Sequence, residues 1–230
     1  ARAIAKVIDE MGYKTAIYAE NVDSRVKDRF VHKISRLQNI GRKDVVIFNH
    51  STGTKLCYSL PELPGRKMMI YHNITPPEFF RPYNATATRL TQYGYEGTEF
   101  LADKIEYAMP VSEYNASELR RMGYKCDMFI RPILIPFEDY AKTPDPEVMS
   151  KYSGDGYVNI VFVGRIAPNK KQEDVIAAFA YYKKRINPKS RLIIVGSSGG
   201  MERYDKALKP YADALMVEDI VFTGQISFPA

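Results

Sequence analysis

The sequence is poor in cysteine and has no long uncharged hydrophobic run. Its two cysteines, Cys57 and Cys126, are too few for a disulfide-stabilised scaffold and favour a reducing compartment. No apolar run approaches the roughly 20 residues that a membrane-spanning helix needs. Hydrophobic residues make up 45% and charged residues 26% of the 230 residues, as in ordinary globular proteins. These features predict a cytoplasmic protein and exclude a disordered tail, a collagen-like repeat and a coiled-coil rod.

The charge balance is weakly basic, with 33 basic and 27 acidic residues and a net charge of +6. An excess of this size fits a polyanion, a phosphate-bearing small molecule or an anionic membrane surface equally well. Tyrosine is abundant but scattered, and no nucleic-acid recognition motif is present, so we expect no nucleic acid as a partner. The charge leaves the kind of ligand open.

Helical and strand patterns alternate along the sequence, which predicts an α/β protein with parallel sheets. In the first part we expect strands over 15–19, 44–48, 67–71, 107–112 and 127–130, and helices over 22–37, 86–103 and 112–122. The second part alternates regularly between strand and helix, with strands over 158–163, 191–195 and 220–223 and helices over 170–186 and 201–215. This order is half of a doubly wound domain.

The stretch from Pro136 to Gly156 separates the two parts. It holds three prolines and two glycines, the composition of a linker or domain crossover. We therefore expect two incomplete Rossmann-like domains, over 1–135 and 157–230, joined by a linker over 136–156. The chain begins inside a predicted helix and stops directly after a strand. We interpret it as a piece that lacks segments on both sides.

The strongest local signal is the run Phe162-Val-Gly-Arg-Ile-Ala-Pro-Asn-Lys-Lys-Gln-Glu-Asp. It places Arg165 just beyond the carboxyl end of a strand and a helix start near Lys170, at the edge where open α/β sheets bind ligands. We expect Asn169 to cap this helix, with Gln172 completing a capping box. The helix N-terminus and the two cations would then bind an anion such as a diphosphate. From the residues alone, a capped surface helix with solvated lysines explains the pattern equally well.

The segment Val163-Gly-Arg-Ile-Ala-Pro-Asn-Lys, followed by Asp174-Val-Ile-Ala-Ala-Phe, resembles the donor-phosphate motif of the family 4 retaining glycosyltransferases. Other segments resemble the same family in order along the chain: Ile70-Tyr-His-Asn-Ile-Thr-Pro, Val111-Ser-Glu-Tyr-Asn, Ile133-Leu-Ile-Pro, Leu192-Ile-Ile-Val-Gly and Ile220-Val-Phe-Thr-Gly-Gln-Ile-Ser. The resemblance covers nearly the whole chain. It implies the GT-B fold, in which two Rossmann-like domains face each other across a cleft, and an enzyme of glycan biosynthesis.

The resemblance implies roles for individual residues. Arg165 and Lys170 would bind the diphosphate of a sugar nucleotide, and Lys171, where many relatives have glycine, would assist Lys170. His72 matches the histidine that lies beside the transferred sugar. The residues alone favour a strand-end histidine bonded to a neighbouring backbone group. Its position after a strand, at the edge where ligands bind, supports the functional interpretation.

Two further groups of residues follow predicted strands. By the resemblance, Gly224 and Gln225 would lie near the nucleoside of the donor. Asn49, His50 and Ser51 are candidates for the acceptor side. A polar strand-to-helix turn explains these three residues at least as well.

The resemblance also implies the course of the reaction. The anomeric configuration would be retained, with attack by an acceptor hydroxyl on the face from which the diphosphate leaves. No Asp-x-Asp triplet or ligand-spaced His/Cys/Asp cluster is present, so we expect no metal and no other cofactor. The acceptor is expected to be a glycan or a glycolipid. The family's glycine-rich loop and Glu-x7-Glu segment would lie before Ala1 and after Ala230, so we expect the chain alone to be inactive.

Three alternatives stay open. The chain could be a non-catalytic Rossmann-type module that binds a nucleotide or phosphosugar, or a sugar-nucleotide hydrolase or phosphorylase. The helix expected over 22–37 lies in a basic stretch from Arg25 to Lys43, and it could rest on anionic lipid at the inner face of the membrane. Such a helix more often packs its apolar face on a sheet.

Overall fold

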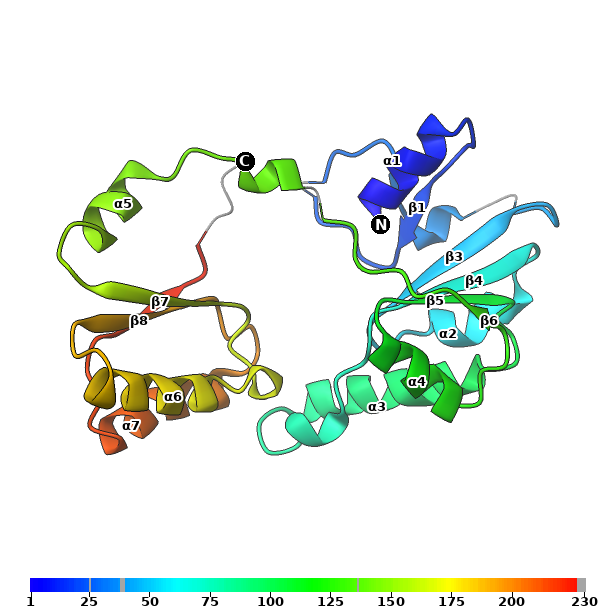
Figure 1. Ribbon diagram of the computed structural model, residues 1–230. Helices are drawn as coiled ribbons and strands as arrows, with labels where there is room; N and C mark the ends of the chain where they lie inside the picture. Colours follow the sequence, from blue (N-terminus) through cyan, green and yellow to red (C-terminus); the bar gives the residue numbers. More distant parts are fainter. Residues whose placement is uncertain (25, 38–39, 136, 227–230) are drawn as a thin grey trace. The chain divides into compact units, whose positions relative to one another are not determined.

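The computed structural model describes residues 1–24, 26–37, 40–135 and 137–226 (Figure 1). The chain divides into two compact units. Unit 1 comprises Ala1–Ile74 and Leu90–Ala141, and unit 2 comprises Thr75–Arg89 and Lys142–Ala230. The division at 141/142 falls inside the predicted linker, whereas no sequence pattern assigns Thr75–Arg89 to the second unit.

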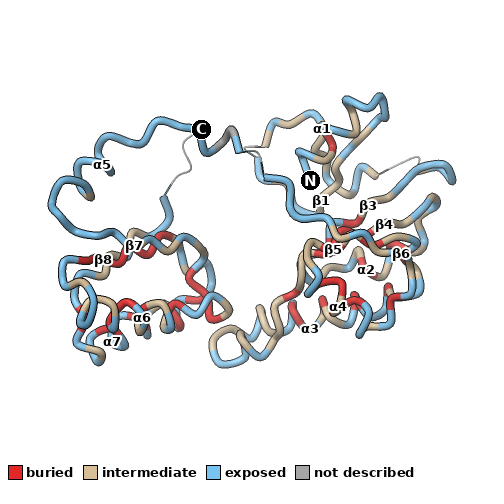
Figure 2. Tube along the Cα trace, in the orientation of Figure 1, coloured by how far each residue is buried: buried red, intermediate tan, exposed pale blue. Residues whose placement is uncertain are grey.

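Unit 1 is built on a four-stranded parallel sheet in the order β3–β4–β5–β6. The strands are β3 (Val45–His50), β4 (Arg66–Tyr71), β5 (Tyr107–Pro110) and β6 (Asp127–Met128). The helices α2 (Leu56–Ser59), α3 (Ala85–Phe100) and α4 (Glu113–Arg121) lie on one side of this sheet (Figure 1). The core between sheet and helices includes Met69, Tyr71, Leu101 and Leu119, and Figure 2 shows how burial concentrates along the facing surfaces.

Two glycines, Gly53 and Gly94, let the backbone of α3 pack directly against the backbone of the turn after β3. A Cβ atom at Gly53 would lie 2.2 Å from the carbonyl oxygen of Leu90, and one at Gly94 would lie 2.9 Å from the backbone nitrogen of Gly53. Such separations are far below van der Waals contact. Glycine normally weakens a helix, but at Gly94 the absence of a side chain is what allows this close packing.

The N-terminal part of unit 1 corrects one prediction. Helix α1 (Arg2–Glu10) is followed by β1 (Ile17–Ala19), which pairs in parallel with β2 (Val31–Lys33), and β2 leads into a 3₁₀ turn, η1 (Ile34–Arg36). The helix predicted over 22–37 is therefore wrong. Aromatic and β-branched residues at 30 and 31 suit a strand, and pairing with β1 outweighs the helical spacing of the apolar positions. The amphipathic helix needed for the membrane-contact alternative is not formed by the described residues.

Unit 2 is built on a three-stranded parallel sheet in the order β7–β8–β9. Its strands are β7 (Val158–Val163), β8 (Ser190–Val195) and β9 (Ile220–Gly224), connected by α6 (Gln172–Arg185) and α7 (Glu202–Ala214). Both helices lie on the same side of the sheet (Figure 1). The predicted succession of strand, helix, strand, helix and strand is confirmed, since buried apolar runs and helical spacing are unambiguous here.

The remaining elements are short. Helix α5 (Pro146–Tyr152) is capped by the Asp145 side chain, which accepts from two backbone N–H groups. The 3₁₀ turns are η2 (Leu60–Glu62), η3 (Pro77–Phe79), η4 (Phe137–Tyr140) and η5 (Pro168–Lys170). Within the described ranges, no helix is both long and apolar enough to cross a membrane.

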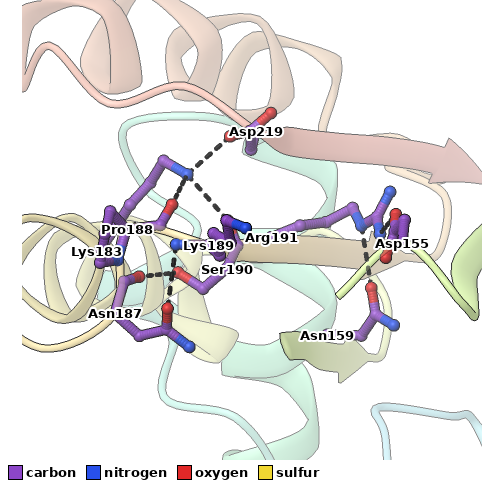
Figure 3. Close-up of polar contacts among 9 residues, drawn as sticks. All are labelled: Asp155, Asn159, Lys183, Asn187, Pro188, Lys189, Ser190, Arg191 and Asp219. Carbon is purple, nitrogen blue, oxygen red and sulfur yellow. Dashed lines mark hydrogen bonds and ion pairs between the residues drawn. The ribbon is translucent and has the colours of Figure 1, made fainter. Parts of the chain in front are cut away.

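Two cations at the amino edge of the unit 2 sheet, Lys183 and Arg191, are paired (Figure 3). The Lys183 ammonium donates to the carbonyl oxygens of Pro188 (2.8 Å) and Ser190 (2.9 Å) and pairs with Asp219 at 2.6 Å. Arg191 forms an ion pair with Asp155 and donates to the side-chain oxygen of Asn159 at 2.9 Å. These contacts tie the starts of the three strands together, so this edge serves the fold.

Candidate functional site

The loops that follow β7, β8 and β9 are joined at the carboxyl edge of the unit 2 sheet. The Ile166 N–H donates to the Ser197 carbonyl and the Gly196 N–H to the Gly224 carbonyl, both at 3.0 Å. A Cβ atom at Gly196 would lie 1.9 Å from the carbonyl oxygen of Gly164. Only glycine therefore permits this approach, and the three loops form one surface.

Arg165 lies on this surface with its backbone fixed and its side chain exposed. Its carbonyl oxygen accepts from the buried Gln172 side chain at 2.9 Å. Its guanidinium donates to the carbonyl oxygen of Gly199 at 2.8 Å, and it makes no ion pair with another side chain in the described part of the chain. Because guanidinium carries five N–H donors in a planar fork, donors remain for an anionic ligand.

The two lysines predicted to share the site lie beside Arg165. Lys170 is exposed at the end of η5, and its ammonium has no hydrogen bond or ion pair among residues 1–24, 26–37, 40–135 and 137–226. Lys171 is left-handed, with φ 53° and ψ 47°, and its ammonium lies 3.6 Å from the Glu173 carboxylate. A residue with a Cβ atom is strained in this conformation, whereas glycine adopts it freely.

The predicted capping of α6 by Asn169 is wrong. The left-handed Lys171 delays the helix to Gln172 and makes no side-chain capping bond, and the Asn169 amide donates instead to the Thr75 hydroxyl at 3.3 Å. The Gln172 N–H donates to the Tyr204 hydroxyl at 3.0 Å. That N–H is thus used within the protein, so the predicted anion site depends on the cations more than on the helix N-terminus.

Tyr204 also binds an acidic side chain in the first turn of α6. Its hydroxyl donates to the Glu173 carboxylate. Burial, and then this hydrogen bond and the charge of Glu173, raise the pKa of Tyr204, so the hydroxyl stays protonated. The first turn of α6 therefore already carries a negative charge of its own.

Gly224 and Gln225 lie at the same edge, where β9 ends. Both are exposed, and Gly224 has a positive φ of 70°. The structure therefore brings them onto the surface that carries Arg165 and the lysines. Their nearness to a nucleoside stays a prediction.

His72 lies in unit 1, directly after β4. Its backbone N–H donates to the His50 carbonyl oxygen at 2.9 Å, and within the described ranges its ring has no hydrogen-bond partner. Partial burial lowers the pKa of His72. The imidazole is therefore neutral at neutral pH and able both to donate and to accept a hydrogen bond.

A buried carboxylate that the sequence analysis missed fixes the chain around His72. Glu118 of α4 is 6% exposed. It accepts from the Tyr71 hydroxyl (2.7 Å), the Asn73 amide (2.9 Å) and the Tyr95 hydroxyl (3.0 Å). Asn73 has a positive φ of 68°. The residues on both sides of His72 are therefore held by one side chain, and only the buried face of α4 hints at this in the sequence.

The three candidates at the carboxyl end of β3 differ in burial. Asn49 and Ser51 are exposed, whereas His50 is fully buried. Its Nε2 lies 2.8 Å from the Thr98 hydroxyl, which donates its own proton to the Gly94 carbonyl, so Nε2 carries the ring proton. Burial lowers the pKa of His50 to about 4. The acceptor-side interpretation therefore does not fit His50, which is a neutral core residue of a polar turn.

In the described ranges, no group of three or more His, Cys, Asp and Glu side chains is placed to hold a metal ion. A metal-independent reaction stays a prediction, because the cations at the edge of unit 2 have not been tested with a ligand.

Comparison with known proteins relates the second unit to a protein family. The sequence model of the family described as glycosyl transferases group 1 matches residues 149–229, a range that contains Arg165, Lys170 and the three joined loops. The predicted resemblance to glycosyltransferases is therefore confirmed for unit 2 at the level of group 1. No match to the sequence is found among curated proteins.

Solved structures of glycosyltransferases share the fold. A glycosyltransferase from Rickettsia africae superposes with a TM-score of 0.62 and 15% identity, over 97% of this chain and 63% of its own. HepE of Anabaena, in complex with UDP and glucose, superposes with a TM-score of 0.56 and 16% identity, over 71% of this chain and 42% of its own. A UDP-forming α,α-trehalose-phosphate synthase from Burkholderia xenovorans superposes with a TM-score of 0.55 and 11% identity, over 80% of this chain and 48% of its own. The chain thus spans less than two thirds of each, and the predicted GT-B-type α/β fold with Rossmann-like parallel sheets is confirmed.

Proposed function

We propose that the protein is a retaining glycosyltransferase that moves a sugar from a nucleoside-diphosphate sugar to a hydroxyl group of a glycan or glycolipid. One observation carries the proposal. At the carboxyl edge of unit 2, inside the matched range, Arg165 and Lys170 are exposed cations that make no ion pair with an acidic side chain of the described residues. Arg165 is near enough to Glu202 to contribute to the lowered pKa of that carboxyl. An exposed pair of such cations at this edge suits a diphosphate.

The chemistry follows from the charge that develops in the reaction. The bond between the anomeric carbon and the diphosphate oxygen breaks, and negative charge builds on the leaving group. Arg165 and Lys170 stabilise that charge, with Lys171 assisting. The acceptor oxygen bonds to the anomeric carbon on the same face, and its proton passes to the leaving diphosphate. No metal or other cofactor is part of the proposal, because the two cations supply the stabilisation.

His72 contributes orientation rather than charge. Its lowered pKa keeps the imidazole neutral, so it forms directional hydrogen bonds with the hydroxyls of the transferred sugar. Gly224 and Gln225 are assigned to the nucleoside. UDP is the first nucleotide to test, since one similar structure holds UDP and glucose and another is described as UDP-forming.

The proposal is tested by calorimetric titration of the chain with UDP, GDP and ADP, beside the Arg165→Ala variant. Binding of one nucleotide that is abolished in the variant supports the donor site. A folded protein that binds none of them, both as this chain and at full length, contradicts it.

Transfer itself is tested in the full-length protein by product analysis with and without acceptor. His72→Ala should leave nucleotide affinity nearly intact and reduce transfer. Sugar release that needs no acceptor would indicate a hydrolase, and nucleotide binding without any product would indicate a binding module. An equal loss of nucleotide affinity in His72→Ala and Arg165→Ala would contradict the proposed roles.

A further inference from the structure

We propose that Asn84 is a positioning residue for the donor site, because its amide group holds the loop between β8 and α7 in place. Asn84 lies outside the range that matches the family, yet it belongs to unit 2. The expected effect of Asn84 on nucleotide affinity rests on the proposed function. The expected effect of Asn84 on the conformation of the loop does not.

Both ends of the Asn84 amide are in use. The amide nitrogen donates to the carbonyl oxygen of Gly200 at 2.6 Å. The amide oxygen accepts from the Ala87 N–H at 2.8 Å and so caps the start of α3. Because only the oxygen can serve the Ala87 N–H, the NH₂ group must face Gly200. One side chain therefore joins the start of a helix to the loop.

The segment that carries Asn84 is anchored in unit 2. Phe80 is 5% exposed and packs in the same core as Ile166 and Met201, which belong to the loops after β7 and β8. The Tyr83 ring lies edge-on to Tyr204, with centroids 5.3 Å apart. Asn84 is thus presented from a packed segment, which a positioning residue requires.

The Ile166 N–H holds the loop at Ser197, and the Glu202 carboxylate accepts from the Gly200 N–H at 2.9 Å. The carbonyl groups at the loop's tip are held by two other side chains, of which one is a proposed ligand-binding group. The Gly199 carbonyl is bound by the Arg165 guanidinium at 2.8 Å, and the next carbonyl, that of Gly200, is bound by Asn84. When Arg165 turns to a diphosphate, it shares or releases Gly199. Asn84 then keeps the loop in the binding conformation. The entropy cost of ordering the loop therefore does not reduce the free energy of nucleotide binding.

Two variants separate the loop contact from the helix cap. Asn84→Asp and Asn84→Ser both keep an oxygen that caps α3. The Asp carboxylate cannot donate to Gly200, and the shorter Ser side chain does not extend to it. Asn187→Asp is the matched control. It makes the same charge change at the amino edge (Figure 3), where the Asn187 side-chain oxygen accepts from the Lys189 N–H at 2.9 Å.

The first measurement is amide hydrogen exchange without nucleotide. We expect faster exchange at Gly200 and Met201 in Asn84→Asp and Asn84→Ser, with exchange at Ala87 and the melting temperature unchanged. Asn187→Asp should match the wild type at all three amides. Unchanged exchange at Gly200 and Met201 in both Asn84 variants would overturn the proposal.

The second measurement is UDP affinity by calorimetry. Loss of one hydrogen bond of this kind corresponds to about a five-fold weaker affinity in both Asn84 variants, with Asn187→Asp unchanged. A loss in Asn84→Asp alone would assign the effect to the added charge and refute positioning. A wild-type protein that binds no nucleotide would refute the proposed function, while hydrogen exchange still decides whether Asn84 holds the loop.

Discussion

The carboxyl edges of the two sheets have the same backbone architecture and opposite side-chain chemistry. In unit 1 two buried groups are paired, Nε2 of His50 with Thr98 and Glu118 with its three donors. Within the described ranges, Nδ1 of the buried His50 has no hydrogen-bond partner. In unit 2 the cationic groups of Arg165 and Lys170 face solvent. A parallel sheet therefore supplies the location for a site, and the pairing of the side chains decides whether the location serves the fold or a ligand.

The amino edge of unit 2 provides an internal reference for this comparison. Lys183 and Arg191 are cations too, with side chains 15% and 16% exposed, and each is paired with an acidic residue. One sheet thus has the ion-paired Lys183 and Arg191 at one edge. At the other edge, Arg165 and Lys170 make no ion pair with the described residues. If the comparison is right, substitutions at the two edges should change different properties.

The largest effect is expected for Arg165→Ala. Removing a charge that contacts the diphosphate should weaken UDP binding by about 2–5 kcal/mol, as measured by calorimetry. Stability should hardly change, because the side chain is exposed and makes one hydrogen bond. The control Arg191→Ala should lower the free energy of unfolding by about 1–2 kcal/mol and leave UDP affinity unchanged. The opposite pattern in the two variants would break the comparison.

Glu118→Ala should have the next largest effect, on stability. The substitution leaves the buried Tyr71 hydroxyl and the Asn73 amide without their acceptor. We expect the free energy of unfolding to fall by about 3 kcal/mol, measured by urea denaturation. UDP affinity of the variant that remains folded should equal that of the wild type. A stable variant with reduced UDP affinity would show that the Glu118 cluster also contributes to nucleotide binding.

The pH dependence of stability tests the buried state of His50. Its pKa of about 4 in the folded protein lies below the ordinary value of 6.5, so the unfolded chain binds more protons between these values. Stability is therefore lost as the pH falls from about 6.5 to 4, by about 2 kcal/mol between pH 7 and pH 5. Urea denaturation at both pH values should show this loss in the wild type and a smaller one in His50→Gln. Equal losses would mean that His50 titrates normally.

The smallest effect is expected for Lys171→Gly. Glycine adopts the left-handed conformation of this residue without strain, so the free energy of unfolding should rise by about 0.5 kcal/mol. UDP affinity should fall less than in Lys170→Ala, because Lys171 already has Glu173 as a neighbour at 3.6 Å. Thermal unfolding measures the change in stability, and calorimetry measures the change in UDP affinity. If Lys171→Gly loses more UDP affinity than Lys170→Ala, then Lys171 and not Lys170 is the main lysine contact of the diphosphate.

The parts of the fold that could be predicted are those specified by local pattern. The apolar runs of β3, β4, β7 and β8 and the helical spacing of α6 and α7 were sufficient to place the strands, the helices and the edge that carries Arg165. The spacing over 22–37 misled because tertiary pairing with β1 determines that stretch.

The missing parts of the site depend on partners that are distant in sequence. Tyr71 and Glu118 are 47 residues apart, and Asn84 and Gly200 are 116 residues apart. Neither glutamate nor asparagine carries a local signal for such a contact. The start of α6 was misplaced for a related reason, since the left-handed Lys171 and the Tyr204 hydroxyl replace the expected Asn169 cap.

Helix α3 is shared, with residues 85–89 in unit 2 and 90–100 in unit 1. The polypeptide therefore passes from one unit to the other three times, at 74/75, 89/90 and 141/142. A chimera that exchanges unit 2 at residue 142 alone would leave Phe80, Tyr83 and Asn84 facing a foreign core. Exchange of the whole of unit 2 therefore requires two fragments, residues 75–89 and 142–230.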